Sequence, residues 1–483
     1  MTLLDATTPE PGAPQPAPST GASRKGWFGQ FLLRLHFYAG IFIGPFILVA
    51  ALSGALYALA PQVEQVVYAK ELHAPTAEAY LPLAAQVEAA NAYLNNAESP
   101  VAVRPAPKPG DTTRVMYAGE NLGPSETRAL FIDPATAEVR GDLTAYGSSG
   151  ALPLRTWIDQ LHSNLQLGEP GRLYSELAAS WLGIIALAGL GLWITRFTRT
   201  NRKKDLLRPN SKAKGYRRLV SWHGSLGIWI LVFVLFLSVT GITWSTYGGA
   251  NVSGLRTALN WKTPSVSTNL TEAPQASGGE HSHHQAPSAP STGAVDPAAF
   301  DTMLSIARGV NVNTGRVEIK PPTAEGKAWV VQEIQRSYPT EVDAVSINGQ
   351  TLDVVDRVDF KDFNLASKLT RWGIDTHMGS MFGLPNQIIL FLVASSIAAM
   401  VVLGYIMWWK RRPTKNPAQR MGNPPAGGAL RRAPWWGTVL VLAVALGVGL
   451  FLPLMGISLA AFVLVDLILM GLRSKRKTLQ PLT

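Results

Sequence analysis

Five long apolar blocks constrain this chain more than any other feature of its sequence. They cover residues 32–59, 173–194, 219–244, 384–409 and 435–472. A helix needs about 20 apolar residues to span a bilayer, so each of the first four blocks predicts one span, while the last is about twice as long. Pro453 near its middle predicts a tight hairpin, which gives six helices. Charged residues make up only 16% of the chain, which also favours a membrane protein.

The net charge of +11 could indicate a nucleic-acid partner, but its distribution argues against one. Segment 196–218 holds ten Lys/Arg and one acidic residue, and segment 410–432 holds seven and none. By contrast, 61–161 holds twelve acidic residues against seven basic, and 248–376 holds fourteen against eleven. Short loops rich in Lys/Arg stay on the cytoplasmic side. The pattern predicts a multi-pass membrane protein with both termini in the cytoplasm and two large domains outside.

These observations divide the chain into alternating membrane and aqueous segments. We expect membrane helices at 27–60, 162–196, 218–247 and 377–410, and a helical hairpin at 434–472. The external domains would cover 61–161 and 248–376, the second with a His-rich loop at 263–294. Basic cytoplasmic loops would cover 197–217 and 411–433, with cytoplasmic tails at 1–26 (disordered) and 473–483. Residues 1–25 lack the apolar core of a cleavable signal peptide.

Two gapless alignments reveal an internal repeat. The first places His36 on His223, and Gly40 then falls on Gly227 and Gly54 on Gly241. The second places His162 on His377, and its further matches include Trp157 with Trp372, Gly168 with Gly383, Pro170 with Pro385, Gly189 with Gly404, Trp193 with Trp408 and Arg196 with Arg411. The unit is therefore a helix, an external domain and a second helix, repeated twice.

Each external domain has the pattern of a helix packed on a small antiparallel sheet. In the first we expect a helix at 83–95 and strands at 114–117, 129–132 and 138–143. In the second we expect a helix at 297–307 and strands at 316–320, 328–334, 342–347 and 352–358, with an Asn-Gly turn at 348–349. The expected fold is thus an all-α transmembrane bundle, made of a four-helix repeat core plus a C-terminal hairpin, with two small α+β domains.

The chain has eight histidines, and the repeat singles out four of them. Three others, His281, His283 and His284, lie in the His-rich loop, where they could bind metal adventitiously. The predicted topology places His36 with His223 near the cytoplasmic face, and His162 with His377 near the periplasmic face. Ionisable side chains at membrane depth are costly and mark functional sites by default.

Two facing imidazoles suit the two axial positions of a haem iron. Zinc would need three or four protein ligands, and the chain contains no cysteine to complete them. Gly40 and Gly227 lie one turn from their histidines, where a side chain would collide with a flat ring. Gly54 and Gly241 lie five turns from the same histidines, near the level of the other pair. Close packing of helices on small residues explains the same four glycines and is compatible with haem.

Tryptophans and arginines flank the four histidines and allow two interpretations. Trp157 and Trp372 are interfacial anchors, as Trp193 and Trp408 are, or form walls near a haem edge. The arginines could pair with haem propionates, and they are Arg34, Arg217, Arg155 and Arg371. The positive-inside rule alone explains Arg34 and Arg217.

These motifs resemble the PepSY-associated transmembrane family over roughly residues 27–415. The resemblance rests on R-L-H-F-Y-A-G-I-F-I-G-P-F, L-H-S-N-L-Q-L-G-E-P-G-R, S-W-H-G-S-L-G-I-W and D-T-H-M-G-S-M-F-G-L-P. Within the family the chain is similar to FoxB-type and PiuB-type iron-regulated inner-membrane proteins. The resemblance implies periplasmic PepSY modules and two b-type haems, with His36 and His223 as one set of axial ligands and His162 and His377 as the other. It also implies ferric-siderophore reduction.

The sequence therefore predicts a di-haem reductase that carries electrons across the membrane to a periplasmic acceptor, with ferric-siderophore iron as the leading candidate. No G-x-G-x-x-G follows a predicted strand, so a cytoplasmic protein or a quinol would have to donate the electrons. One alternative is a haem adaptor that passes electrons to a separate periplasmic enzyme. The other is a haem-free sensor or binding protein that uses its PepSY domains. Membrane lipid is an expected partner, and nucleic acid is not.

Overall fold

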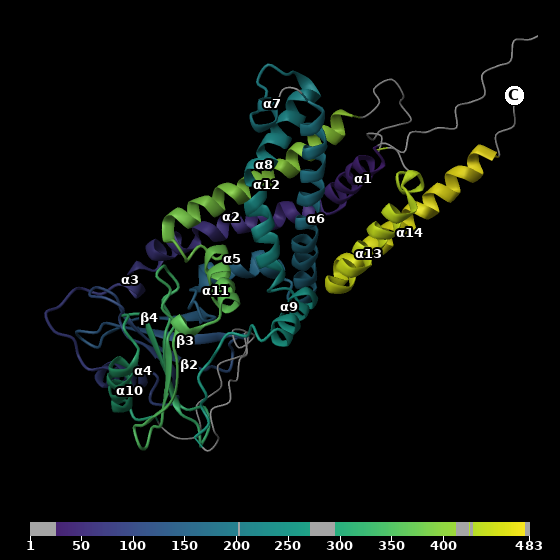
Figure 1. Cartoon of the computed structure of the whole chain (residues 1–483). Helices are drawn as coiled ribbons and strands as arrows, with labels where there is room; N and C mark the ends of the chain where they lie inside the picture. Colours follow the sequence, from purple (N-terminus) through teal and green to yellow (C-terminus); the bar gives the residue numbers. More distant parts are fainter. Residues whose placement is uncertain (1–25, 201–202, 271–294, 412–424, 426–427, 479–483) are drawn as a thin grey trace, which may run out of the picture.

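The computed structural model describes residues 26–200, 203–270, 295–411, 425 and 428–478. Long helices form one part of the molecule, and an antiparallel sheet lies at one end of them (Figure 1). We call that end the sheet end and the opposite one the far end. The predictions for residues 1–25 and for His281, His283 and His284 lie outside the described residues.

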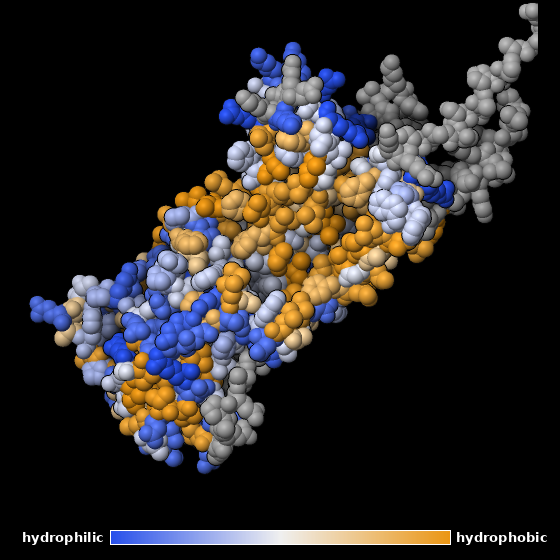
Figure 2. Space-filling model, viewed as in Figure 1, coloured by the Kyte–Doolittle hydropathy of each residue, from blue (hydrophilic) through white to orange (hydrophobic). Residues whose placement is uncertain are grey.

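Within the described part of the chain, four helices are long and apolar enough to cross a membrane. They are α2 (Gly44–Val67), α6 (Glu169–Arg199), α8 (Gly215–Ile242) and α12 (Gly383–Lys410). Hydrophobic residues cover the surface over these helices, whereas hydrophilic residues gather over the sheet and at the far end (Figure 2). This distribution is that of a multi-pass membrane protein.

The first apolar block is not one helix as expected, but two. α1 (Trp27–Phe42) and α2 are separated at Ile43, and Pro45 occupies the first turn of α2. Proline has no N–H to donate to the carbonyl four residues earlier, which is that of Ile41. The hydroxyl of Tyr405 on α12 donates to this carbonyl at 2.5 Å instead. The neighbouring helix α12 therefore satisfies the carbonyl group that the break leaves without a partner, as backbone polar groups at membrane depth require.

The C-terminal block forms the expected hairpin, with α13 (Trp435–Phe451) and α14 (Pro453–Thr478) meeting at Leu452. Their apolar parts are shorter than those of the four long helices, so a count of six spans stays a prediction. Trp181 on α6 donates its indole N–H to the Ser458 hydroxyl at 2.9 Å, which fixes the hairpin to the bundle.

Short helices connect the long ones. Those at the sheet end include α3 (Ala69–Leu72), α5 (Pro153–Asn164), α9 (Tyr247–Ala258), α11 (Leu365–His377) and the 3-10 turn Phe360–Asp362 (Figure 1). Those at the far end include α7 (Lys204–Leu207) and the 3-10 turn Leu430–Arg432. His162 therefore lies on α5, ahead of a membrane helix that begins at Glu169 rather than at residue 162.

The two external domains do not form two small sheets as expected, but share one. Its strands are β1 (Pro100–Arg104), β2 (Thr113–Tyr117), β3 (Glu126–Ile132), β4 (Val139–Tyr146), β5 (Val317–Lys320), β6 (Trp329–Glu333), β7 (Ala344–Ile347) and β8 (Val354–Val358). Their order is β4-β3-β2-β1-β5-β6-β7-β8. β1 and β5 pair antiparallel at the centre, with Val103 opposite Ile319. Two separate sheets would leave both strands as exposed edges, and joining them removes those edges.

One hydrophobic core spans the seam between the two halves of the sheet. α4 (Leu83–Tyr93) and α10 (Ala298–Val310) lie side by side and bury their apolar faces against strands of both halves (Figure 1). A buried ion pair crosses the seam, with a guanidinium nitrogen of Arg104 2.6 Å from Glu318. Burial of Glu318 opposes its ionisation, but Arg104 and Lys320 hold the pKa of this carboxyl well below its usual range.

The repeat extends into the hairpin loops of the sheet. Asp133 and Asn348 occupy matching positions, and each accepts a backbone hydrogen bond at 2.9 Å from the residue two further on. Ala137 and Leu352 then both adopt a left-handed conformation, with φ of 60° and 65°. The expected turn at Asn348 is thus a longer loop, and it has a counterpart in the first half.

Candidate functional site

The four repeat histidines form two pairs at different levels of the helical bundle. His36 on α1 lies beside His223 on α8, with ring centroids 6.0 Å apart and ring planes at 81°. His162 on α5 and His377 at the end of α11 lie at the sheet end, next to α2 and α8 respectively. We call the first two the far pair and the second two the sheet-end pair.

The separation of the far pair suits a shared metal ion. Metal–imidazole bonds are about 2.0 Å long, so one ion bonded to both rings would place their centroids roughly 6 Å apart. The Nδ1 atom of His36 donates to the Ile185 carbonyl at 2.9 Å, which leaves its Nε2 atom with a free lone pair. The Nδ1 atom of His223 is buried without a hydrogen-bond partner among the described residues.

A cavity of about 420 Å³ opens around the far pair. Four glycines of the repeat line it: Gly40, Gly189, Gly227 and Gly404. A Cβ atom on Gly40 or Gly404 would meet nothing within 4 Å, whereas one on Gly189 would come within 3.2 Å of the His36 ring. The glycines at 40 and 404 are therefore not explained by close helix packing, and they leave room for a flat ligand.

Aromatic and basic residues complete the wall of this cavity. Trp193 and Trp408, which match in the repeat, both line it, as do Arg196 and Arg411. Arg34 instead donates to the Pro425 carbonyl at 3.2 Å and lies over the Tyr38 ring. Arg217 is not among the lining residues. The arginines placed to contact a ligand in this cavity are therefore Arg196 and Arg411, which the alignment matched. Arg34 and Arg217, which lie close to the histidines in sequence, do not line it.

The sheet-end pair is oriented by two hydroxyl groups. The Nδ1 atom of His162 lies 3.1 Å from the Ser53 Oγ atom, and that of His377 lies 2.6 Å from the Thr240 Oγ1 atom. Each hydroxyl already donates to a carbonyl one turn back, at Val49 and Phe236 respectively. With its proton so placed, each oxygen can accept from the Nδ1–H tautomer of the imidazole, and in that tautomer Nε2 is free to act as a ligand atom.

The glycines next to these hydroxyls contact the same histidines. A Cβ atom on Gly54 would lie 3.0 Å from the His162 Cε1 atom, and one on Gly241 would lie 3.9 Å from that of His377. Both glycines thus stand at the level of the sheet-end pair, as their distance along the helices predicted. Trp244 packs edge-on against His377, with ring centroids 5.1 Å apart.

The arginines at the sheet end are held by groups of the chain itself. Arg371 donates its Nε–H to Asp375 at 2.8 Å. Arg155 donates to the Tyr57 hydroxyl at 3.3 Å and lies 3.9 Å from Glu64, while its buried Nε atom has no partner among the described residues. Burial raises the pKa of Asp159 to about 6, although the charge of Arg155 opposes this.

The two tryptophans that precede this pair differ in their surroundings. Trp157 is 53% exposed, which suits an interfacial anchor, whereas Trp372 packs against Phe360. Sequence reasoning did not assign roles to Ser53 and Thr240. Their match in the repeat, next to Gly54 and Gly241, was the signal that could have identified them.

Comparison with known proteins identifies a family for most of the chain. Residues 33–411 match the family model described as the PepSY-associated TM region. No curated protein matches the chain.

Proposed function

This chain belongs to the family of PepSY-associated TM regions, and we propose that it is a two-haem reductase that carries electrons across a membrane to an acceptor at the sheet end. The observation that carries the proposal is the pair of histidine sites at two levels of one bundle. In each pair at least one imidazole has its Nδ1 atom within hydrogen-bond distance of an oxygen, which leaves its Nε2 atom available to bind iron. The FoxB-like and PiuB-like resemblance suggests ferric-siderophore iron as the acceptor.

His36 and His223 would hold one haem b and His162 and His377 the other. The open glycine positions at 40 and 404 and the 420 Å³ cavity fit a flat macrocycle at the far level. A bound haem would supply one-electron chemistry through its iron. Arg196 and Arg411 are placed to bind its carboxylates from the far end of the cavity.

The residues around each pair would keep its imidazoles neutral and fixed in orientation. Ile185, Ser53 and Thr240 accept the Nδ1 protons, which prevents the rings from turning. Apolar side chains such as Ile47, Val234 and Ile397 surround the far pair and exclude water. A dry site with fixed ligands sets the potential of a redox centre, because solvent exposure and hydrogen bonding both shift it.

The proposed direction follows from charge and from chemistry. The described residues of the two basic segments, which are 196–200, 203–218, 410–411, 425 and 428–432, lie at the far end, and we infer that this end faces the cytoplasm of a bacterial inner membrane. The sheet would then lie in the periplasm and offer the larger surface to a bulky acceptor. Fe(II) binds hard oxygen chelators more weakly than Fe(III), so reduction would release iron from a siderophore. The donor would be a cytoplasmic protein or a quinol.

Two measurements on the purified chain test this function. A pyridine haemochrome assay should show b-type haem at about two per chain, and finding one or none would overturn the two-site proposal. A ferric siderophore mixed with the dithionite-reduced protein should then remove the reduced haem bands in stopped-flow spectroscopy. If these bands persist while another acceptor oxidises them rapidly, the acceptor is not a siderophore.

A further inference from the structure

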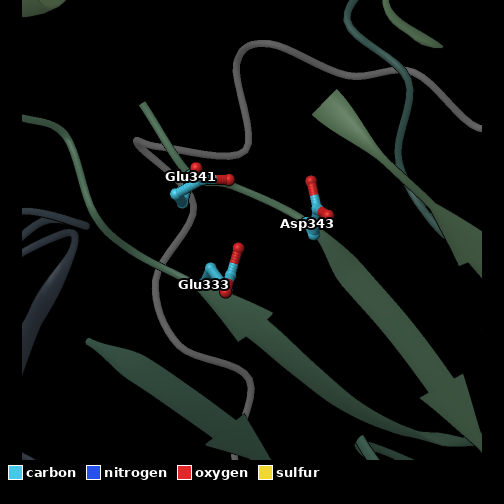
Figure 3. Close-up of side chains that lie close together, drawn as sticks. All are labelled: Glu333, Glu341 and Asp343. Carbon is cyan, nitrogen blue, oxygen red and sulfur yellow. The ribbon is translucent and has the colours of Figure 1, made fainter. Parts of the chain in front are cut away.

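Three carboxylates converge on the hairpin that joins β6 to β7. Glu333 ends β6, Asp343 directly precedes β7, and Glu341 lies in the connection between them (Figure 3). One carboxylate oxygen from each residue lies within 4.8 Å of those from the other two. Like charges at this distance repel, so the arrangement calls for a compensating group.

Glu333 supplies the observation that points to a ligand. Its side chain is only 3% exposed, and its Oε1 atom accepts hydrogen bonds from the backbone N–H groups of Asn313 and Thr314, at 2.6 and 2.9 Å. Its Oε2 atom is buried and has no partner among the described residues. One oxygen of Glu333 points toward Glu341 and Asp343 (Figure 3). Since Oε1 is engaged elsewhere, the unpartnered Oε2 is the atom left to face them.

No basic side chain in the described residues forms an ion pair with these three carboxylates. Arg357, on β8, and Lys361, in the 3-10 turn that follows it, pair instead with Asp359 at 2.6 and 3.3 Å. The backbone N–H of Phe360 donates to Asp343 at 2.7 Å, which compensates only part of the negative charge. The cluster is thus short of positive charge.

We propose that Glu333, Glu341 and Asp343 bind a calcium ion. Calcium takes six to eight oxygen ligands at about 2.3–2.6 Å, so two oxygens on one ion lie at most roughly 5 Å apart, in keeping with the observed spacing. Three carboxylates from one hairpin suit its flexible geometry. Magnesium keeps several waters and uses one or two carboxylates in a near-ideal octahedron, so it fits this donor set less well.

The position of the hairpin gives the bound ion a structural consequence. Tyr338, between Glu333 and Glu341, donates its N–H to the Met381 carbonyl at 2.8 Å, and its ring packs against Phe382. Met381 lies four residues beyond His377. An ion that fixes the base of the hairpin would therefore steady the segment that follows a histidine of the sheet-end pair.

Isothermal titration calorimetry of the full chain in detergent, after treatment with a chelator, tests the proposal. Calcium chloride should bind with about one ion per chain, and magnesium chloride should bind at least tenfold more weakly. Imidazole is a poor ligand for calcium, so the histidines at 281, 283 and 284 do not compete in this measurement. Absence of calcium binding, or tighter binding of magnesium, would overturn the assignment.

A matched pair of variants locates the site. Glu341→Gln should weaken calcium binding at least tenfold, whereas Glu325→Gln, which removes the same charge from the exposed turn between β5 and β6, should leave it unchanged. Without calcium, Glu341→Gln should melt no lower than the parent, because it removes repulsion. Equal affinity in both variants would place the ion elsewhere. Haem content is not part of the readout, so this test fails or succeeds independently of the proposed function.

Discussion

The Nδ1 atom of His377 lies 2.6 Å from the hydroxyl oxygen of Thr240, and His162 stands in the same relationship to Ser53 at 3.1 Å. In both cases a histidine of the far pair precedes the hydroxyl in the same membrane segment. Thr240 lies on α8, which also carries His223, and Ser53 lies on α2, which follows α1 with His36. The first membrane segment of each repeat thus carries a histidine at one level and the hydroxyl that orients a histidine at the other. The same two segments therefore contribute to both sites.

Thr240→Val should weaken haem retention at the sheet-end site. Valine has the shape of threonine but cannot accept the imidazole proton, and loss of such an orienting partner typically costs about 10–100-fold in metal affinity. Redox difference spectra would show loss or broadening of one haem component. Thr257→Val is the control, because its hydroxyl bonds within α9. A normal spectrum for Thr240→Val would show that the hydroxyl does not orient the ligand.

The histidine variants should fall into two classes. His36→Ala and His223→Ala should each remove the far haem, and His162→Ala and His377→Ala the sheet-end haem, because the structure pairs them by level. Haem content should drop from two to one in every case. If His36→Ala and His162→Ala abolished the same spectral component, the assignment of ligands by level would be wrong.

Gly40→Leu should exclude the far haem while the fold survives. A side chain at this position enters the cavity without meeting another atom at Cβ, so it competes only with a ligand. The protein should reach the membrane and melt normally but carry one haem. Gly447→Leu on α13, where a Cβ atom also meets nothing, should carry two. Full haem content in Gly40→Leu would mean that no ligand occupies this part of the cavity.

Arg104→Leu should destabilise the sheet by about 3–5 kcal/mol, because it leaves Glu318 charged, buried and without its main partner. Arg128→Leu, which breaks the more exposed pair with Asp142, should cost under about 1 kcal/mol. Denaturant unfolding of the detergent-solubilised protein measures both. Similar costs for the two variants would contradict the role given to the seam.

Stability should fall as pH rises through the pKa of Asp159. Its folded pKa of about 6 exceeds its ordinary value of 3.8, so between these values the folded state binds more protons than the unfolded state. The penalty is complete above pH 6 and reaches at most roughly 3 kcal/mol. Asp159→Asn should therefore raise the melting temperature at pH 7.5 and change it little at pH 4. A uniform shift across pH would contradict this cause.

Periodicity and spacing predicted much of this structure, and what they missed has identifiable causes. The four long helices, α4, α10 and seven strands arise where local patterns indicated them, because apolar blocks and alternation report local burial. β1 was missed because it begins at Pro100 and is followed directly by Pro105, and prolines interrupt the pattern of a strand. Its pairing with β5 depends on residues more than two hundred positions away, which no local pattern encodes.

Some residues of the candidate site were likewise predicted from the sequence, and others were missed. Gly54 and Gly241 were placed at the level of the sheet-end pair by helix geometry alone, and the structure confirms that level. Ser53 and Thr240 went unassigned because a hydroxyl in a membrane helix commonly bonds back to its own helix, as both also do. The break at Ile43 was missed because a long helix can tolerate a proline such as Pro45. The compensating hydroxyl comes from Tyr405 on α12, which is distant in the sequence.

The seam between β1 and β5 sets an order on biogenesis. When the ribosome has made β1, its partner strand is still more than two hundred residues away, and two further membrane helices must be inserted first. At about 5–20 residues per second, translation of that interval takes roughly 10–40 s. With the sheet in the periplasm, as proposed, the first half-sheet presents β1 during this time as an open edge across the membrane from the ribosome. Assembly of this protein therefore needs either a chaperone bound to that edge or an intermediate whose edge strand does not pair with a strand of another chain.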